Sequence, residues 1–226
     1  MEIVNHLLYN QGKQVTFKQT PNHGGALNPK YLLIHYDASN NATGAISWML
    51  SPTSKVSAHL HIDREGKIVQ LAKFNQVCYH AGKSTWEGLS GLNNYSIGIE
   101  LQNNGVQDYT AIQLAVCLEV SKSLVSHYKL KDVLGHSDVS PKRKIDPGVK
   151  FPMAEFRKAS GISVCEVIKT TSDLNLREGA GTEFAKLAVL KKDTVVTVKS
   201  VTGDWSKVDV VNSNLSGYVS SKYLTT

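Results

Sequence analysis

Cysteine is scarce in this chain, and its few copies are not spaced as a set. The 226 residues include three cysteines, Cys78, Cys117 and Cys165, and no C-x-x-C pair. An odd number at such spacings argues against a disulfide framework, and the missing pairs argue against a thiolate zinc finger. We expect these side chains to be small buried or neutral thiols.

Long apolar runs are also missing. No segment approaches the roughly 18 consecutive apolar residues of a membrane-spanning helix, so we expect no stable membrane insertion. Residues 1–6, MEIVNH, lack the basic residues and the apolar stretch of a secretory signal. We therefore expect that work outside the cytoplasm would depend on release or non-classical export, and a cytoplasmic location stays open as the alternative.

The charge is unbalanced, with a net charge of +6 that lies mostly in residues 1–165. A positive excess suggests an anionic partner, either nucleic acid or an acidic polymer such as a cell wall. Because the sequence shows neither a known nucleic-acid reading motif nor basic residues clustered with stacking aromatics, we expect no nucleic acid binding. The balance of apolar and charged residues is typical of a folded globular protein, and we expect a monomer.

The order of the predicted elements indicates a mixed α/β domain. Strand-forming runs at 31–36, 56–62, 67–71 and 96–101 predict strands, with a hairpin turn at Gly66. Helical spacing predicts a short helix at 43–50 and a longer one after Thr110, where Thr110 and Gln113 fit a capping box. A mixed β-sheet flanked by helices follows. The face of the longer helix that should cover this sheet carries Ile112, Ala115, Leu118, Leu124, Val125 and Tyr128.

The pattern changes after residue 160. Short β-rich runs at 187–190, 194–201 and 205–211 alternate with polar or glycine-containing turns, which predicts a small all-β barrel. We therefore place one domain at residues 1–160, a linker at 161–165 and the barrel at 166–226.

The most informative stretch is residues 135–148, GHSDVSPKRKIDPG. Its glycines and prolines break helices and strands, so the polar groups between them lie on an exposed connection. His136 and Asp146, together with His35 at a predicted strand end, offer two nitrogen ligands and one oxygen ligand. A catalytic zinc site uses three such protein ligands and keeps a position for water. We therefore predict that His35, His136 and Asp146 bind Zn²⁺.

The remaining histidines are weaker candidates. His59 and His61 lie two residues apart on one face of a predicted strand, so a competing metal pair is conceivable, although no third ligand lies nearby in the sequence. We predict that His59 lines the active site and that His61 is structural. His6, His23 and His127 are predicted to be surface or packing residues.

Five motifs occur in order over about residues 20–155. They are LIHY at 33–36, VSAHLHIDREGKIVQ at 56–70, YHAGKS at 79–84, NYSIGIE at 94–100, and the stretch at 135–148. Together they resemble the type 2 N-acetylmuramoyl-L-alanine amidases, the superfamily that includes AmpD-like amidases, phage endolysins and peptidoglycan-recognition proteins. The resemblance implies zinc-dependent cleavage of the amide bond between N-acetylmuramic acid and L-alanine, with peptidoglycan as the partner.

The same resemblance implies roles for single residues. His35, His136 and Asp146 match the family's zinc ligands, and Asp146 is typical of the AmpD-like branch rather than the branch with a cysteine ligand. Glu100 matches the acidic residue near the zinc water, and Lys144 matches the cation two residues before the third ligand. A carboxylate that moves a proton and an ammonium that stabilises an oxyanion suit amide hydrolysis.

One position departs from the pattern of some phage members. They carry a tyrosine immediately before the hairpin histidine, where this chain has Ala58. Any role of that tyrosine is therefore not transferred, and we expect Glu100 to carry the proton. The residues predicted to bind substrate are Tyr36, His59, His80 and Trp86.

The last 60 residues have a resemblance of their own. The motifs are LNLREGAGT at 174–182, GDWSKV at 203–208 and GYVSSKYL at 217–224, and they resemble a bacterial SH3-like domain. The resemblance implies attachment to cell walls, with a rigid accessory to the first domain as the alternative. For the whole chain, a wall-lysing endolysin, a cytoplasmic recycling amidase for soluble anhydro-muropeptides and a non-catalytic peptidoglycan-binding protein stay open.

Overall fold

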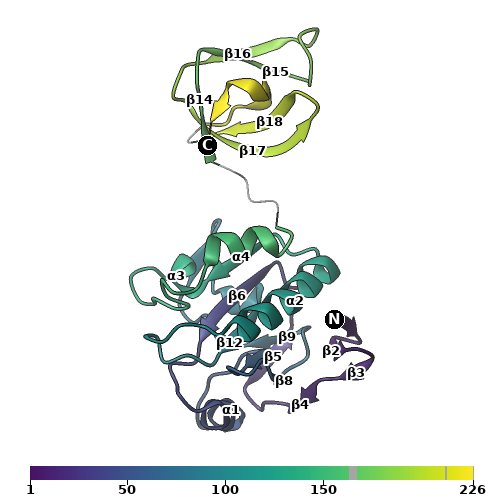
Figure 1. Ribbon diagram of the computed structural model, residues 1–226, viewed down its shortest axis with the longest axis vertical. Coiled ribbons are helices and arrows are strands. Elements are labelled where there is room, and N and C mark those ends of the chain that lie inside the picture. Colours follow the sequence, from purple (N-terminus) through teal and green to yellow (C-terminus); the bar gives the residue numbers. More distant parts are fainter. Residues whose placement is uncertain (163–166, 212, 226) are drawn as a thin grey trace. The chain divides into compact units, whose positions relative to one another are not determined.

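The computed structural model describes residues 1–162, 167–211 and 213–225 (Figure 1). The chain divides into two compact units, Met1–Ile162 and Ser163–Thr226, and each has a hydrophobic core of its own. The division falls close to the boundary expected after residue 160. Of the expected linker, residues 161–165, the last three lie outside the described residues.

A six-stranded mixed sheet forms the centre of the first unit. Its neighbouring strands are parallel, except that β7 and β8 pair antiparallel as a hairpin. Gly66 in the hairpin turn has φ +81°, a left-handed conformation that favours glycine. The expected mixed sheet is confirmed. In order across the sheet the strands are β13 (Asp132–Gly135), β6 (Tyr31–Tyr36), β12 (Ser96–Leu101), β7 (Leu60–Ile62), β8 (Ile68–Gln70) and β4 (Thr16–Phe17).

One face of this sheet is apolar and covered by helices. Successive side chains of a strand point to opposite faces, so Leu32 and Ile34 of β6 share a face. Both belong to the large buried cluster that also takes in Val120 of α2 (Ala111–Tyr128) and Phe156 of α4 (Met153–Ala159). Both helices lie over the sheet in Figure 1.

The other face carries a row of polar side chains. In the parallel register, Glu100 of β12 pairs with His35 of β6 on one side and with His61 of β7 on the other. Paired residues point to the same face of a sheet, so His35, Glu100 and His61 lie side by side. This row fixes the position of the candidate site.

Helix α2 begins as expected but faces the sheet differently. Thr110 is its N-cap, and its Oγ1 accepts a hydrogen bond of 3.2 Å from the backbone N of Gln113. The Gln113 side chain does not complete a capping box; it turns inward and donates to the carbonyls of Ile62 and Gln102, each at 3.1 Å. These bonds fix the rotation of the helix, and the prediction that Ile112 covers the sheet is wrong, because it is 52% exposed. The buried positions of α2 are Gln113, Cys117, Val120, Ser121 and Leu124.

Helix α1 (Ala42–Leu50) forms where a short helix was expected. Asn41 caps it, since its side chain accepts a hydrogen bond of 3.1 Å from the backbone N of Gly44. Met49 packs in a small cluster with Val69 and Leu71 of the hairpin region. Helix α1 therefore covers the hairpin end of the polar face.

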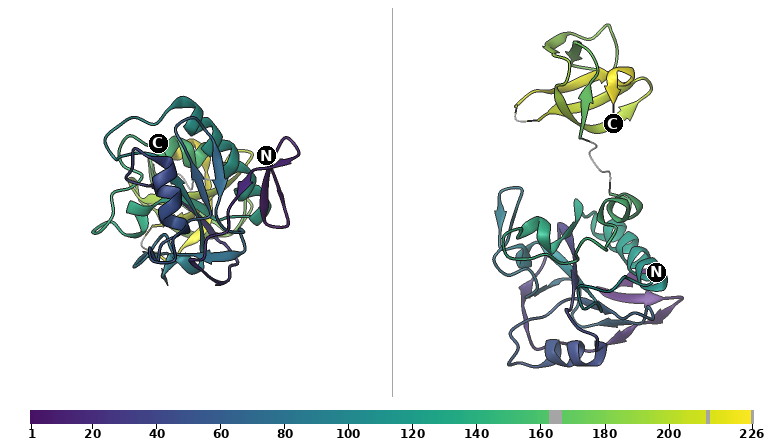
Figure 2. Two further views of the ribbon diagram at one scale, coloured as in Figure 1. Left: turned by 90° about the horizontal axis from the view of Figure 1, so that it is seen from below. Right: turned by 60° about the vertical axis from the view of Figure 1, so that its left-hand side comes forward.

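Short elements complete the first unit. Strand β1 lies beside α2 (Figure 2). There the terminal amino group of Met1 pairs with Glu119 at 3.1 Å. The short elements are β1 (Glu2–Val4), β2 (Leu7–Asn10), β3 (Lys13–Gln14), β5 (His23–Ala26), β9 (Gln76–Cys78), β10 (Thr85–Trp86), β11 (Leu89–Ser90), the 3-10 helix η1 (Leu92–Asn94) and α3 (His136–Val139).

The second unit is the expected all-β domain. Its strands pair antiparallel around a small core that includes Leu176, Val196, Val208 and Val219. In order across the sheet they are β16 (Lys186–Leu190), β15 (Leu174–Arg177), β19 (Ser216–Ser220), β18 (Trp205–Val210), β17 (Val195–Thr202), β14 (Val167–Thr170) and β20 (Leu224–Thr225), with the 3-10 helix η2 (Ser221–Tyr223) before β20.

Two of the three cysteines can be placed. Cys78 and Cys117 are free and buried, and burial raises the pKa of each thiol to about 12. Cys165 lies outside the described residues. Within the described ranges, no helix is long and apolar enough to cross a membrane.

Candidate metal centre

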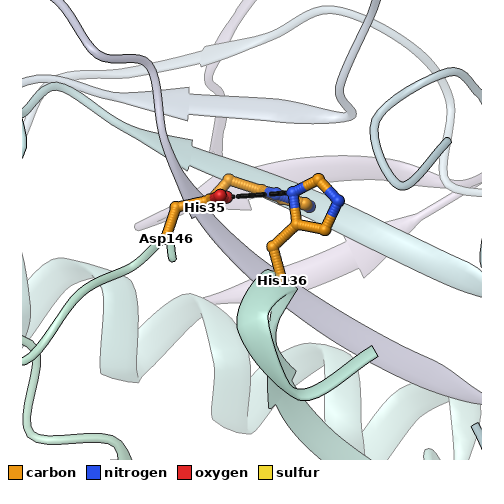
Figure 3. A group of neighbouring side chains, drawn as sticks. All are labelled: His35, His136 and Asp146. Atoms are coloured by element: carbon orange, nitrogen blue, oxygen red, sulfur yellow. Dashed lines mark hydrogen bonds and ion pairs between the residues drawn. The ribbon is translucent and has the colours of Figure 1, made fainter. Parts of the chain in front are cut away.

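Three side chains converge at the polar face of the sheet, as Figure 3 shows. His35 lies near the end of β6, His136 begins α3, and Asp146 follows in the adjoining loop. The atoms His35 Nδ1, His136 Nδ1 and Asp146 Oδ2 are each 3.0 Å from the other two. All three residues are buried. The structure therefore brings together the three residues predicted as metal ligands.

The loop that carries two of these ligands is closed by its own backbone. Gly135 N donates to Asp138 Oδ2 at 2.8 Å, and Ser137 N donates to the carbonyl of Asp146 at 2.9 Å. A Cβ at Gly135 would lie 2.8 Å from Cδ of Pro147, so only glycine fits here without a shift. The start and end of the 135–148 stretch are thus tied side by side.

The proton positions favour a cation between the three atoms. His136 Nε2 lies 3.0 Å from the carbonyl oxygen of Ala81, and His35 Nε2 lies 3.0 Å from His80 Nδ1. Protons on both Nε2 atoms leave both Nδ1 atoms as lone pairs that face the Asp146 carboxylate. Electron-rich atoms this close repel one another unless a positive ion binds them. The donor set fits a metal ion.

The electrostatics agree with neutral imidazoles beside an ionised carboxylate. Burial lowers the pKa of His35, and the neighbouring His136 adds to the effect while Asp146 opposes it. Burial alone would raise the pKa of Asp146, but the closeness of the His136 and His35 imidazoles outweighs it and holds this pKa well below its ordinary value. Neutral histidine and ionised aspartate are the forms that bind metals.

Glu100 lies beside this centre and is short of partners. Its Oε2 is buried and has no hydrogen-bond partner among the described residues. Burial raises the pKa of Glu100 well above its ordinary value; the carboxylates of Asp146 and Asp37 raise it further, and Lys144 lowers it in part. A raised pKa makes the carboxyl of Glu100 better suited to act as a general acid or base.

A pocket of about 440 Å³ opens over these groups. The three candidate ligands line it together with Glu100 and Lys144. Its lining also contains exposed apolar side chains, namely Trp48 (57% exposed), Val56, Tyr79 and Ile145. The site thus combines a polar floor with an apolar rim, which suits a ligand with both kinds of surface.

The residues predicted to bind substrate do not all meet here. Tyr36 and His80 line the pocket, whereas His59 and Trp86 do not. His59 is fully buried, where Nδ1 accepts from Gly98 N at 3.0 Å and Nε2 lies 2.8 Å from the carbonyl of Gln76. Trp86 packs against a separate apolar cluster. The geometry therefore indicates that His59 and Trp86 serve in packing and hydrogen bonding rather than in the pocket lining.

Trp48 and Tyr79 are the aromatic residues of the pocket lining that sequence reasoning missed. Trp48 lies on α1, and nothing in its spacing separates an exposed tryptophan from a packed one. The sequence favours Trp86 instead, because an aromatic plane suits sugar or peptide contacts. Which of the two faces the pocket depends on how α1 packs against the sheet.

Comparison with known proteins decides the family. The model of the N-acetylmuramoyl-L-alanine amidase family matches residues 25–149, more than half of the chain. The chain belongs to this family. A bacterial SH3 domain model matches residues 172–225. The resemblances found in the sequence are therefore confirmed for both parts of the chain.

Curated relatives are similar to part of this chain. The chain is 41% identical over 105 residues to the 1,6-anhydro-N-acetylmuramyl-L-alanine amidase AmpD of Escherichia coli K12, covering 46% of this chain and 57% of that protein. It is 32% identical over 145 residues to the N-acetylmuramoyl-L-alanine amidase AmiD of the same organism, covering 56% of this chain and 51% of AmiD. The chain thus spans about half the length of the curated relatives it matches.

Solved structures are similar as well. A crystal structure of AmpD superposes with a TM-score of 0.62 at 28% identity and covers 70% of this chain and 99% of that one. The Escherichia coli AmiD structure, a complex with the substrate anhydro-N-acetylmuramic acid-L-Ala-D-gamma-Glu-L-Lys, gives a TM-score of 0.56 at 27% identity and covers 72% of this chain and 69% of that one.

Proposed function

We propose that this protein hydrolyses the amide bond between N-acetylmuramic acid and L-alanine in peptidoglycan, with Zn²⁺ as its cofactor. The observation that carries the proposal is the triangle of His35 Nδ1, His136 Nδ1 and Asp146 Oδ2, with sides of 3.0 Å. Membership of the amidase family supports the choice of bond.

The donor set suits zinc in number and spacing. Two nitrogens and one oxygen are a common protein ligand set of catalytic zinc. Ligand atoms about 2.0–2.1 Å from a tetrahedral zinc ion lie roughly 3.3 Å apart, close to the spacing of these three atoms. Zinc bound here would polarise the substrate carbonyl and lower the pKa of a bound water towards ~7.

Glu100 and Lys144 supply the remaining chemistry. Glu100 accepts a proton from the attacking water and returns it to the departing amine of L-alanine, a use that its raised pKa favours. The Lys144 ammonium stabilises the negative charge that develops on the carbonyl oxygen. Both side chains line the same pocket as the ligand triangle, so all the groups that hydrolysis needs lie around one space.

The substrate is expected to lie along the apolar rim. Trp48 and Tyr79 offer aromatic surfaces to a sugar ring or to the first residues of the stem peptide. The AmiD complex, with an anhydro-muropeptide named as its substrate, supports a ligand of this class.

Intact wall and soluble muropeptide are both candidate substrates. The bacterial SH3 domain favours intact wall, because such a domain would hold the enzyme on an insoluble polymer. The similarity to AmpD favours the soluble anhydro form that its name gives. We propose intact wall as the main substrate.

Product analysis tests the activity. The full chain is incubated with purified sacculi and with soluble anhydro-muropeptide, with and without a chelator, and the products are identified by mass spectrometry. We expect stem peptides that begin with a free L-alanine amine, their loss with chelator and their return with added zinc. Binding to sacculi without cleavage would instead support a non-catalytic binding protein.

Two variants and one control assign the site. Asp146→Ala removes a ligand and Glu100→Gln removes the proton carrier, so each should lower the rate by about 100-fold or more. Asp108→Ala is the matched control, because Asp108 is an exposed carboxylate that pairs with Lys150 at 2.9 Å and does not line the pocket. Undiminished peptide release by Asp146→Ala would refute the proposed site.

A further inference from the structure

We propose that His80 and Ala81 are positioning residues that fix the ring orientation and the proton of both metal-binding histidines. The inference rests on the zinc site of the proposed function. It differs from the expectation that His80 binds substrate, and it gives the motif at residues 79–84 a role in holding the ligands.

His80 stands directly behind His35. His80 Nδ1 lies 3.0 Å from His35 Nε2, and His80 Nε2 lies 3.3 Å from the carbonyl oxygen of Ser96. A backbone carbonyl only accepts, so His80 carries its proton on Nε2 and offers the lone pair of Nδ1 to His35. His35 must then carry its own proton on Nε2. Its Nδ1 is left as a lone pair that points at Asp146 and His136, as a metal ligand requires.

Ala81 does the same for the second histidine. Its carbonyl oxygen lies 3.0 Å from His136 Nε2, so this nitrogen carries the proton and Nδ1 is free to bind a metal. Arg143 Nη2 also approaches His136 Nε2, at 3.2 Å. However, this nitrogen donates to the carbonyls of Ala81 and Lys83 at 2.7 and 3.0 Å, which uses both of its protons. The contact between Arg143 and His136 is therefore packing.

The segment is itself held in place. Asn93 Oδ1 accepts hydrogen bonds from the backbone N of His80 at 3.0 Å and of Ala81 at 2.7 Å. Gly98 of β12 leaves room for the His80 ring, since a Cβ there would lie 2.6 Å from Cγ of His80. Two adjacent residues thus serve both histidines from a single anchored turn.

This arrangement leaves His80 little to offer a substrate. Both of its ring nitrogens face protein groups, although the residue lines the pocket. Hydrogen-bond partners behind a metal-bound histidine typically change metal affinity by about 10- to 100-fold. Removing the acceptor at position 80 should therefore weaken metal binding. Loss of a substrate contact would instead raise KM and leave metal binding unchanged.

Zinc affinity, measured by competition with a chromophoric chelator, tests the proposal on the full chain. His80→Leu should bind zinc about 10- to 100-fold more weakly, and His80→Asn, whose amide oxygen can accept from His35, should recover part of the loss. Gly98→Ala keeps the histidine but displaces its ring, and should also weaken zinc binding. His6→Leu is the control, because His6 Nδ1 pairs with the Tyr128 hydroxyl at 2.8 Å and the residue does not line the pocket, so its loss should leave the zinc affinity of the folded protein unchanged.

The wild-type protein provides a readout that needs no variant. In the zinc-loaded chain, the imidazole ¹⁵N resonances of His35, His80 and His136 should each show the proton on Nε2. A proton on His80 Nδ1, or zinc affinity of folded His80→Leu equal to that of wild type, would overturn the inference while leaving the amidase intact. Wild-type protein that binds no zinc would instead refute the proposed function.

Discussion

His59 is a buried histidine that should make the first unit sensitive to acid. Burial lowers its pKa from 6.5 to about 4, although the hydrogen bond to the Gln76 carbonyl opposes the shift. The folded state therefore favours neutral His59, whereas the unfolded chain takes up a proton near the ordinary pKa. Above pH 6.5 the group contributes nothing to the pH dependence. As the pH falls from about 6.5 to 4, the folded state loses stability, and the loss is complete below the folded pKa.

The size of the effect follows from the shift. A difference of about 2.5 pKa units at about 1.36 kcal/mol per unit gives a loss of about 3 kcal/mol at full protonation, and roughly 2 kcal/mol at pH 5. This loss is a substantial part of the free energy of unfolding of an ordinary domain, which is only about 5–15 kcal/mol. Within the described residues, the α-helices all belong to the first unit, so helical circular dichroism reports this unit.

The assay compares wild type with His59→Gln by urea unfolding at pH 7 and pH 5, in the presence of chelator so that metal release does not contribute. His59→Gln loses some stability at both pH values, but the loss between pH 7 and pH 5 should be about 2 kcal/mol smaller than in wild type. Equal losses in the two proteins would show that His59 is not held neutral by burial, and would refute the reasoning.

Three further predictions concern the site and the second unit. Gly135→Ala places a Cβ 2.8 Å from Pro147 Cδ, so it should lower the free energy of unfolding by about 1–3 kcal/mol. A urea titration that shows no change would contradict the tight closure of the loop. Trp48→Ala should raise KM about 3- to 10-fold with kcat unchanged, measured by steady-state kinetics on soluble muropeptide. A fall in kcat alone would contradict the place of Trp48 on the rim of the pocket. Removal of residues 163–226 should lower the rate on sacculi about 10- to 100-fold but leave the rate on soluble muropeptide unchanged. Equal effects on both substrates would indicate an accessory role for the SH3 domain.

The sequence was sufficient to predict that His35, His136 and Asp146 come together, because each stands out from its local surroundings. His136 and Asp146 share one turn-rich stretch, and His35 interrupts an otherwise apolar strand, so each stands out without knowledge of the fold. The mixed sheet, its hairpin and the small β domain also follow from short-range patterns.

Contacts between distant segments could not be predicted in this way. Gln113 was expected to cap α2, but its amide donates to the carbonyl of Ile62 at the end of β7 and to that of Gln102 just after β12. These bonds set the rotation of the helix and leave Ile112 exposed. Likewise, the partner of His35 lies 45 residues away in the chain and meets it only through the packing of His80 on Gly98. Neither pairing leaves a signal in residue spacing.

The apolar face of the sheet decides where the polar groups of the site stand. Glu100 lies beside His35 only in the observed register of β12 against β6. A slip of one residue would turn Glu100 into the apolar cluster under α2 and bring Ile99 or Leu101 to the site face. Burying an unpaired carboxyl there costs several kcal/mol, and the apolar side chains would lose their own burial. Buried apolar residues therefore position Glu100 beside His35, through the strand register that their burial enforces.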